Sequence, residues 1–178
     1  MKILTFGAST SASSINRQFA KYAASQLQGA ELTDLDSRTF ELPVFNVDLE
    51  TADGIPSSAK RFLELIQSHD ALVVSLAEHN GTYTSAFKNL YDWTSRLDQR
   101  IWSGKPMLLL STSPGARGGA TVMEAAKATF PRMGAQVIGS FSLPSFYDHF
   151  SAERGITHEG LNVEFQEVLK AFSATISG

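Results

Sequence analysis

A run of hydroxyl side chains follows the first apolar segment of the chain. Five of the six residues from Ser9 to Ser14 are serine or threonine, and Ile15 and Asn16 then open a stretch with helical spacing. Backbone N–H groups at a helix N-terminus favour a phosphate, and serine hydroxyls can donate hydrogen bonds to its oxygens. The pattern predicts an anion-binding loop, for which the alternative is a serine-rich loop with a helix cap. The loop has neither a nucleotide P-loop sequence nor a GxGxxG fingerprint.

A second polar loop begins at Glu78 and His79, directly after another apolar run. It continues with Asn80 and Gly81, a dipeptide that signals a tight turn. Such a turn can offer backbone amides and carbonyls to the edge of a planar heterocycle. The alternative is an ordinary turn between a strand and a helix.

A third loop runs from Ser113 and Pro114 through a glycine-rich stretch. Three of the five residues from Gly115 to Gly119 are glycine. Glycine tolerates positive φ and lets the backbone come close to a bound ring, although a flexible surface loop is the alternative. We expect all three loops to lie together, because each follows an apolar run of strand length.

The elements that must position these loops alternate along the chain. Apolar runs of this length suit strands buried in a parallel sheet, and one more polar segment suits the sheet edge. The expected strands are Lys2–Phe6, Glu31–Leu35 (the edge), Ala71–Ala77, Met107–Ser111 and Gln136–Phe141. Helical spacing marks the intervening stretches, at Ile15 to Leu27, Phe62 to Ile66, Phe87 to Thr94, Val122 to Phe130 and Val163 to Phe172. Ala52–Ser58 and Phe146–Gly155 are expected to be surface loops.

This alternation predicts an open α/β sandwich, in which ligands bind beyond the carboxyl ends of the strands. The length of 178 residues favours a single domain over residues 1–178. The loops after the first, third and fourth strands would then share one edge of the sheet.

Composition narrows the classes of function. A net charge of −3 argues against a nucleic-acid partner, which needs a basic face. No apolar run approaches the roughly 18 residues of a membrane span, and the N-terminus is too short for a signal-peptide core, so we expect a cytoplasmic protein without a membrane partner. Cysteine is absent, so electrons would need a bound organic cofactor. The four histidines show no metal-ligand spacing, and we expect no metal.

These loops carry a resemblance to a known family. The sequence resembles the NADPH-dependent FMN reductases, a flavodoxin-like family that includes quinone, azo-dye and chromate reductases. Its G-S-x-R-x-x-S-x-N loop is matched at Ser9, Ser14 and Asn16, whereas Ala8 replaces the glycine and Ser11 stands where arginine is common.

The most specific match lies in the second loop. The family's P-E-Y-N-G-S segment corresponds to Ala77–Thr82, with His79 in place of tyrosine and Ala77 in place of proline. Its L-K-N-x-x-D-W continuation corresponds to Phe87–Trp93, and Ser113-Pro114-Gly115 and Leu42–Asn46 also look like family features.

The resemblance implies a three-layer flavodoxin-like sandwich, with a five-stranded parallel sheet of order 2-1-3-4-5 and helices on both faces. It also implies bound FMN, NADPH or NADH as co-substrate, ping-pong transfer of electrons to a small-molecule acceptor, and a homodimer or homotetramer. The implied FMN-binding residues are Ser9, Ser11, Ser14, Ile15, Asn16, Glu78, His79, Asn80, Gly81, Ser113 and Gly115.

Three alternatives stay open for the chemistry. The flavin itself would carry the reaction, although His79 could donate a proton to a reduced quinone. The protein could instead be an electron carrier that does not oxidise NAD(P)H. A serine hydrolase is the third reading, because Ser9 follows a strand and precedes a helix, but the second glycine of a nucleophile elbow is missing.

Overall fold

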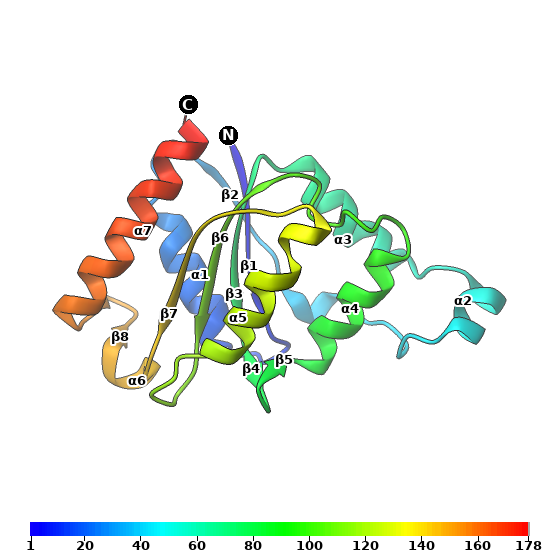
Figure 1. Ribbon diagram of the computed structural model, residues 1–178, viewed down its shortest axis with the longest axis horizontal. Helices are drawn as coiled ribbons and strands as arrows, with labels where there is room; N and C mark the ends of the chain where they lie inside the picture. The colour runs from blue at the N-terminus through cyan, green and yellow to red at the C-terminus, as the bar shows by residue number, and fades with distance from the viewer. Residues whose placement is uncertain (178) are drawn as a thin grey trace.

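The computed structural model describes residues 1–177, and a parallel sheet runs through its centre (Figure 1). The five strands lie in the order β2-β1-β3-β6-β7, all parallel, which confirms the predicted order 2-1-3-4-5. Their bounds are β1 (Lys2–Ala8), β2 (Glu31–Asp34), β3 (Ala71–Leu76), β6 (Pro106–Thr112) and β7 (Gln136–Leu143). The three inner strands are almost wholly buried because helices cover both of their faces, whereas the edge strand β2 is exposed or half-buried.

Helices cover both faces of the sheet and divide the core in two (Figure 1). On one face, α1 (Ile15–Ser25) and α7 (Glu159–Ser177) bury Phe19 and Phe165 against strand residues such as Ile3. On the other face lie α3 (Ser57–Ser68), α4 (Ser85–Ser95) and α5 (Ala120–Thr129). Their apolar stripes contribute Phe62 and Phe87 to the second cluster. The predicted helices are therefore confirmed, with each apolar stripe facing the sheet.

The remaining elements are short. They are η1 (Ser37–Thr39), α2 (Val47–Asp53), the hairpin of β4 (Glu78–His79) with β5 (Thr82–Tyr83), η2 (Pro131–Met133), α6 (Phe146–His149), and the hairpin of β8 (Phe150–Ser151) with β9 (Gly155–Ile156). Of residues 1–177, none belongs to a helix that is both long enough and apolar enough to cross a membrane.

Two segments expected to be surface loops are partly regular instead. Ala52–Ser58 includes the end of α2, whose start is capped by the Asn46 side chain, and the beginning of α3. Phe146–Gly155 forms α6 and most of the β8–β9 hairpin, because the buried Phe146 ring stacks on Phe150 with centroids 4.7 Å apart. The packing of Phe146 on Phe150 therefore gives regular structure to a segment whose polar residues had suggested a surface loop.

Gly7 sets how closely α1 can approach the end of β1. A Cβ atom at this position would lie 2.3 Å from the Arg17 nitrogen and 2.7 Å from the Asn16 carbonyl carbon, both of them backbone atoms. No side chain can swing aside to relieve such a contact. The loop between β1 and α1 therefore keeps its shape only with glycine at this position.

We expect Gly7→Ala to lower the free energy of unfolding by about 1–3 kcal/mol, as overpacking does, because α1 must move away from the sheet. Urea denaturation followed by circular dichroism measures this change. Gly160→Ala is the matched control, since its Cβ would make only ordinary contacts with the His158 ring. Equal unfolding midpoints for Gly7→Ala and the parent protein would contradict the expectation.

Candidate active site

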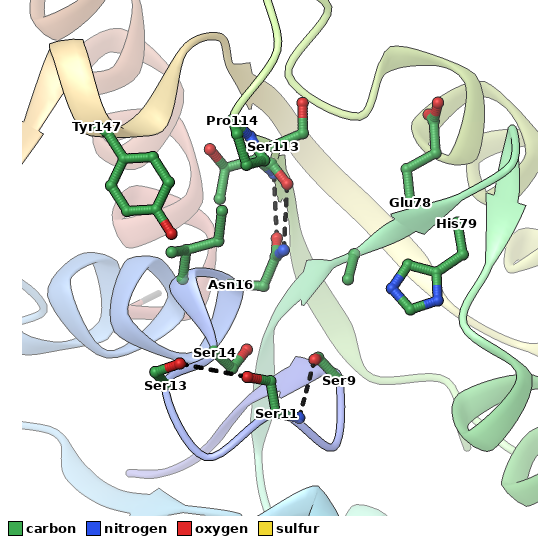
Figure 2. A pocket seen from close by; sticks show the side chains of 13 residues that line it. Ser9, Ser11, Ser13, Ser14, Asn16, Glu78, His79, Ser113, Pro114 and Tyr147 are labelled. Atoms are coloured by element: carbon green, nitrogen blue, oxygen red, sulfur yellow. Dashed lines mark hydrogen bonds between the residues drawn. The ribbon is translucent and has the colours of Figure 1, made fainter.

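A cavity of about 200 Å³ opens at the carboxyl ends of β1, β3 and β6 (Figure 2). This is the edge at which ligands bind in open α/β sheets. The three predicted loops do meet there. The cavity is lined by Ser9, Ser11, Ser13, Ser14, Ile15, Asn16, Ala77, Glu78, His79, Thr112, Ser113, Pro114 and Tyr147.

The hydroxyl-rich loop turns its backbone toward this cavity. Ser14 caps α1, with its Oγ accepting a hydrogen bond from the Arg17 N–H at 3.1 Å. Ser9 Oγ accepts one from the Ser11 N–H at 3.2 Å. Within the described part of the chain, the N–H groups of Ala12, Ser13, Ile15 and Asn16 have no hydrogen-bond partner. Ser11 Oγ and Ser13 Oγ lie 3.4 Å apart and pair with each other. Unpaired N–H donors at a helix start, beside serine hydroxyls, are an arrangement that favours an anion, and we call it the cradle.

Asn16 braces this loop from behind. Its side chain is buried, with Oδ1 accepting from the Thr112 N–H at 3.0 Å and from Ser75 Oγ at 2.7 Å. Its Nδ2 donates to the Thr112 carbonyl at 3.1 Å. One amide thus joins α1 to β6 and β3. Asn16 borders the cavity as predicted, but three of its bonds are to the protein itself.

Arg17 points away from the cradle. Its guanidinium contacts Asp34 at 3.0 Å and Asp36 at 2.9 Å, beside the edge strand β2. The hydrogen bonds that Arg17 donates to Asp34 raise the pKa of Arg17, and the guanidinium of Arg38 holds the pKa of Asp36 well below its ordinary value. The two carboxylates therefore hold the Arg17 side chain toward the edge of the sheet, although Arg17 is the cation nearest to the cradle in the sequence.

The β4–β5 hairpin forms the opposite side of the cavity. Glu78 Oε2 accepts a hydrogen bond from the Val122 N–H at 3.0 Å, in the first turn of α5, whose N-cap Gly119 has no side chain to do so. Glu78 is therefore a helix-capping residue that fixes the hairpin, while His79 is exposed at the rim. Asn80 has a φ of 51°, and the turn places it outside the cavity lining.

The third loop contributes Ser113 and Pro114. Gly81 and Gly115, although predicted, are not among the lining residues. Gly118 serves packing, because a Cβ at this position would lie 2.7 Å from the Leu143 carbonyl carbon. Five further lining residues were not predicted from the sequence, namely Ser13, Ala77, Thr112, Pro114 and Tyr147. Four of these adjoin predicted residues, whereas Tyr147 comes from a segment mistaken for a loop.

Comparison with known proteins gives the family. The model of a family described as NADPH-dependent FMN reductase matches residues 1–148, most of the chain. The chain belongs to this family.

Individual FMN reductase relatives match shorter stretches. A quinone reductase of Pseudomonas putida is 40% identical over 107 residues, which is 60% of this chain and 56% of that protein. An NAD(P)H-dependent FMN reductase of Pseudomonas aeruginosa is 36% identical over 88 residues, which is 49% of this chain and 45% of that protein. The chain thus matches about half the length of these curated relatives.

Solved structures agree on the flavodoxin-like fold of this FMN reductase family member. FerB, a flavoenzyme NAD(P)H:(acceptor) oxidoreductase from Paracoccus denitrificans, superimposes with a TM-score of 0.77 and 27% identity, covering 99% of this chain and 97% of FerB. A flavodoxin from Pseudomonas aeruginosa superimposes with a TM-score of 0.58 at 17% identity, covering 100% of both chains, a likeness of fold alone.

We expect Asn16→Ala to lower the free energy of unfolding of this FMN reductase family member by about 2–5 kcal/mol, because it leaves buried groups of Thr112 and Ser75 without partners. Ser75→Ala is the matched control, since it removes a single bond and should cost about 1 kcal/mol. Urea denaturation of both variants tests the difference. Similar losses for the two substitutions would show that Asn16 is not the brace that the geometry describes.

Proposed function

We propose that this protein binds FMN and uses NADPH or NADH to reduce a small acceptor such as a quinone. The observation that carries the proposal is the cradle of unpaired N–H groups and hydroxyls beside the Glu78–His79 hairpin, in a chain of the FMN reductase family. A neighbour solved with FMN, an NADH-azoreductase of Bacillus anthracis, has the same fold.

The residues present fit FMN. Ser9, Ser11 and Ser14 would donate hydroxyl hydrogen bonds to its phosphate, and the backbone at Ile15 and Asn16 would add N–H donors. Asn16 would act chiefly by holding this backbone in place. The other end of the cavity would take the ring.

At the ring end, His79, Asn80 and Gly81 would offer the hairpin backbone to one edge, and Glu78 would keep that hairpin fixed to α5. Ser113 would border the ring, and Gly115 would leave room for it. Ala77 and Pro114 add uncharged surface to the lining. Among the described lining residues Glu78 is the only Asp, Glu, Lys or Arg, and its carboxylate accepts a hydrogen bond from the Val122 N–H.

FMN supplies the redox chemistry, accepting a hydride from the nicotinamide and releasing electrons to the acceptor. The protein's part is to bind and orient. The nicotinamide and the acceptor would occupy the same face of the ring in turn, which is the ping-pong sequence that the family resemblance implies. His79, exposed at the rim, could donate a proton to a reduced quinone.

The proposal extends to organisation. We propose a single domain over residues 1–178, since both core clusters pack on one sheet. We also propose a cytoplasmic homodimer or homotetramer. Val44 and Val47, which are 80% and 65% exposed near α2, offer apolar surface for self-association. Light scattering after size exclusion measures the oligomeric state, and a monomer at micromolar concentration would contradict this part.

FMN should bind the apoprotein much more tightly than riboflavin, because the cradle is built for a phosphate. Its affinity should change by less than about twofold between low and moderately high salt, since sheltered neutral donors are screened less than exposed ion pairs. Isothermal titration of both ligands across a salt series measures this. Equal affinities for FMN and riboflavin would contradict the cradle assignment. A steep loss of FMN affinity with salt would mean that Arg17 reaches the phosphate.

Ser11→Arg is the informative variant for the same titration. We expect it to tighten FMN binding at low salt by roughly 1 kcal/mol, about fivefold, and to introduce a salt dependence that the parent protein lacks. Riboflavin is the control ligand, because it has no phosphate for the new arginine to meet.

Direct oxidation of NAD(P)H separates the enzyme from an electron carrier. We expect excess NADPH or NADH to bleach the flavin absorbance of the FMN-loaded protein within seconds in a stopped-flow experiment. Adding a quinone should then restore the absorbance. Steady-state rates should give parallel double-reciprocal lines, as ping-pong exchange requires. Flavin that stays oxidised under both nucleotides would establish the carrier instead.

A further inference from the structure

Tyr147 also lines the cavity, but it lies in α6 and not in any of the three loops described above. It is 71% exposed, and among the described lining residues it is the only phenylalanine, tyrosine or tryptophan. Figure 2 shows its hydroxyl directed toward the side of the cavity where Ser13 and Ser14 lead into α1. Within residues 1–177 this hydroxyl has no hydrogen-bond partner. Its donor is therefore free for a ligand.

The turn that presents Tyr147 is held against the third loop. Ser145 adopts the left-handed conformation, with φ 47° and ψ 59°, a strained choice for a residue other than glycine. Its N–H donates to the Gly115 carbonyl at 3.0 Å, and the Phe146 N–H donates to the Ser113 carbonyl at 3.0 Å. Strain of this kind persists where surrounding contacts enforce it, commonly beside functional sites.

The far side of the turn is fixed as well. His149 Nδ1 lies 2.9 Å from the Pro144 carbonyl, to which it donates. The Thr157 N–H donates to the His149 carbonyl at 2.8 Å, and Phe146 is buried against Phe150. The exposed ring is thus carried by backbone that is tied down on both sides. Only the rotamers of the Tyr147 side chain would then need to be ordered when a ligand binds.

Lysine and arginine side chains, which could bind a phosphate instead of the Tyr147 hydroxyl, are not found in the described lining of the cavity. Arg17 and Lys21 are paired with Asp34, and Arg117 donates to Thr121. A phosphate in the cradle must therefore be held by neutral donors. Each additional neutral donor is worth more at such a site, because hydrogen bonds to charged groups are the stronger kind.

We propose that the Tyr147 hydroxyl donates a hydrogen bond to the phosphate of the bound flavin nucleotide and closes the cradle from the α6 side. This inference rests on the proposed function, since it names a further residue at the same site. Tyr147 is a binding residue in this view and takes no part in electron transfer.

Tyr147→Phe tests the inference because it removes only the hydroxyl. FMN affinity should fall roughly tenfold or more, the net worth of a hydrogen bond to a charged acceptor, while riboflavin affinity should not change. The ³¹P chemical shift of bound FMN should move as well, and this readout is independent of turnover. Tyr22→Phe is the matched control, since Tyr22 is a partly exposed tyrosine of α1 outside this cavity.

The outcomes separate this inference from the function on which it rests. The parent protein could prefer FMN to riboflavin while Tyr147→Phe binds both ligands as tightly as the parent does. The cradle assignment would then hold, and the proposed role of Tyr147 would be wrong. Equal losses for FMN and riboflavin would also overturn it, because the hydroxyl would then act away from the phosphate. If the parent protein shows no preference for FMN, the proposed cradle fails and the inference fails with it.

Discussion

The buried amide of Asn16 is the interaction on which the candidate site depends. A parallel sheet leaves the ends of its strands without further ladder partners, and three such ends must meet under the cavity floor. Asn16 accepts from Thr112 and Ser75 and donates to Thr112, so one side chain ties the start of α1 to β6 and β3. An aliphatic side chain of similar size could fill the space but would satisfy none of these groups.

Other side chains complete the same floor. Ser37 Oγ donates to the Gly7 carbonyl at 2.8 Å, and Thr84 Oγ1 donates to the Ala8 carbonyl at 3.0 Å while also capping α4. Glu78 caps α5 from the hairpin across the cavity. Small polar residues at the strand ends thus do two things together, since they end the sheet without unpaired groups and they fix where each following helix begins.

Much of this arrangement could be predicted from the residue pattern, for physical reasons. Apolar runs such as Ala71–Leu76 have few alternatives to a buried strand, and the hydroxyl run before Ile15 has few alternatives to a helix start. The strand order came from the family resemblance and not from the runs themselves. The family's conserved pattern also located His79 and Ser113 at the cavity.

The features of the site that could not be predicted depend on contacts between residues far apart in the sequence. Asn16 and Glu78 border the cavity, yet their bonds to Thr112 and Val122 span 96 and 44 positions of chain, so the residue pattern could not identify these partners. Tyr147 was missed because its segment is polar except for Phe146 and Phe150, whose stacking only the folded chain reveals. Gly81 and Gly115 do not line the cavity themselves but lie within two residues of His79 and Pro114, which do, and the turn signals alone could not tell these positions apart.

The pairing of Arg17 with Asp34 and Asp36 has a kinetic consequence. With that guanidinium neutralised and a net charge of −3, the protein offers a dianionic nucleotide no attractive field at long range. Encounter is then unsteered or weakly repelled, and added salt should quicken association by screening the repulsion. Tight binding would have to arise from slow escape. A nucleotide bound tightly at such a site would exchange slowly, as a resident cofactor does and a substrate does not.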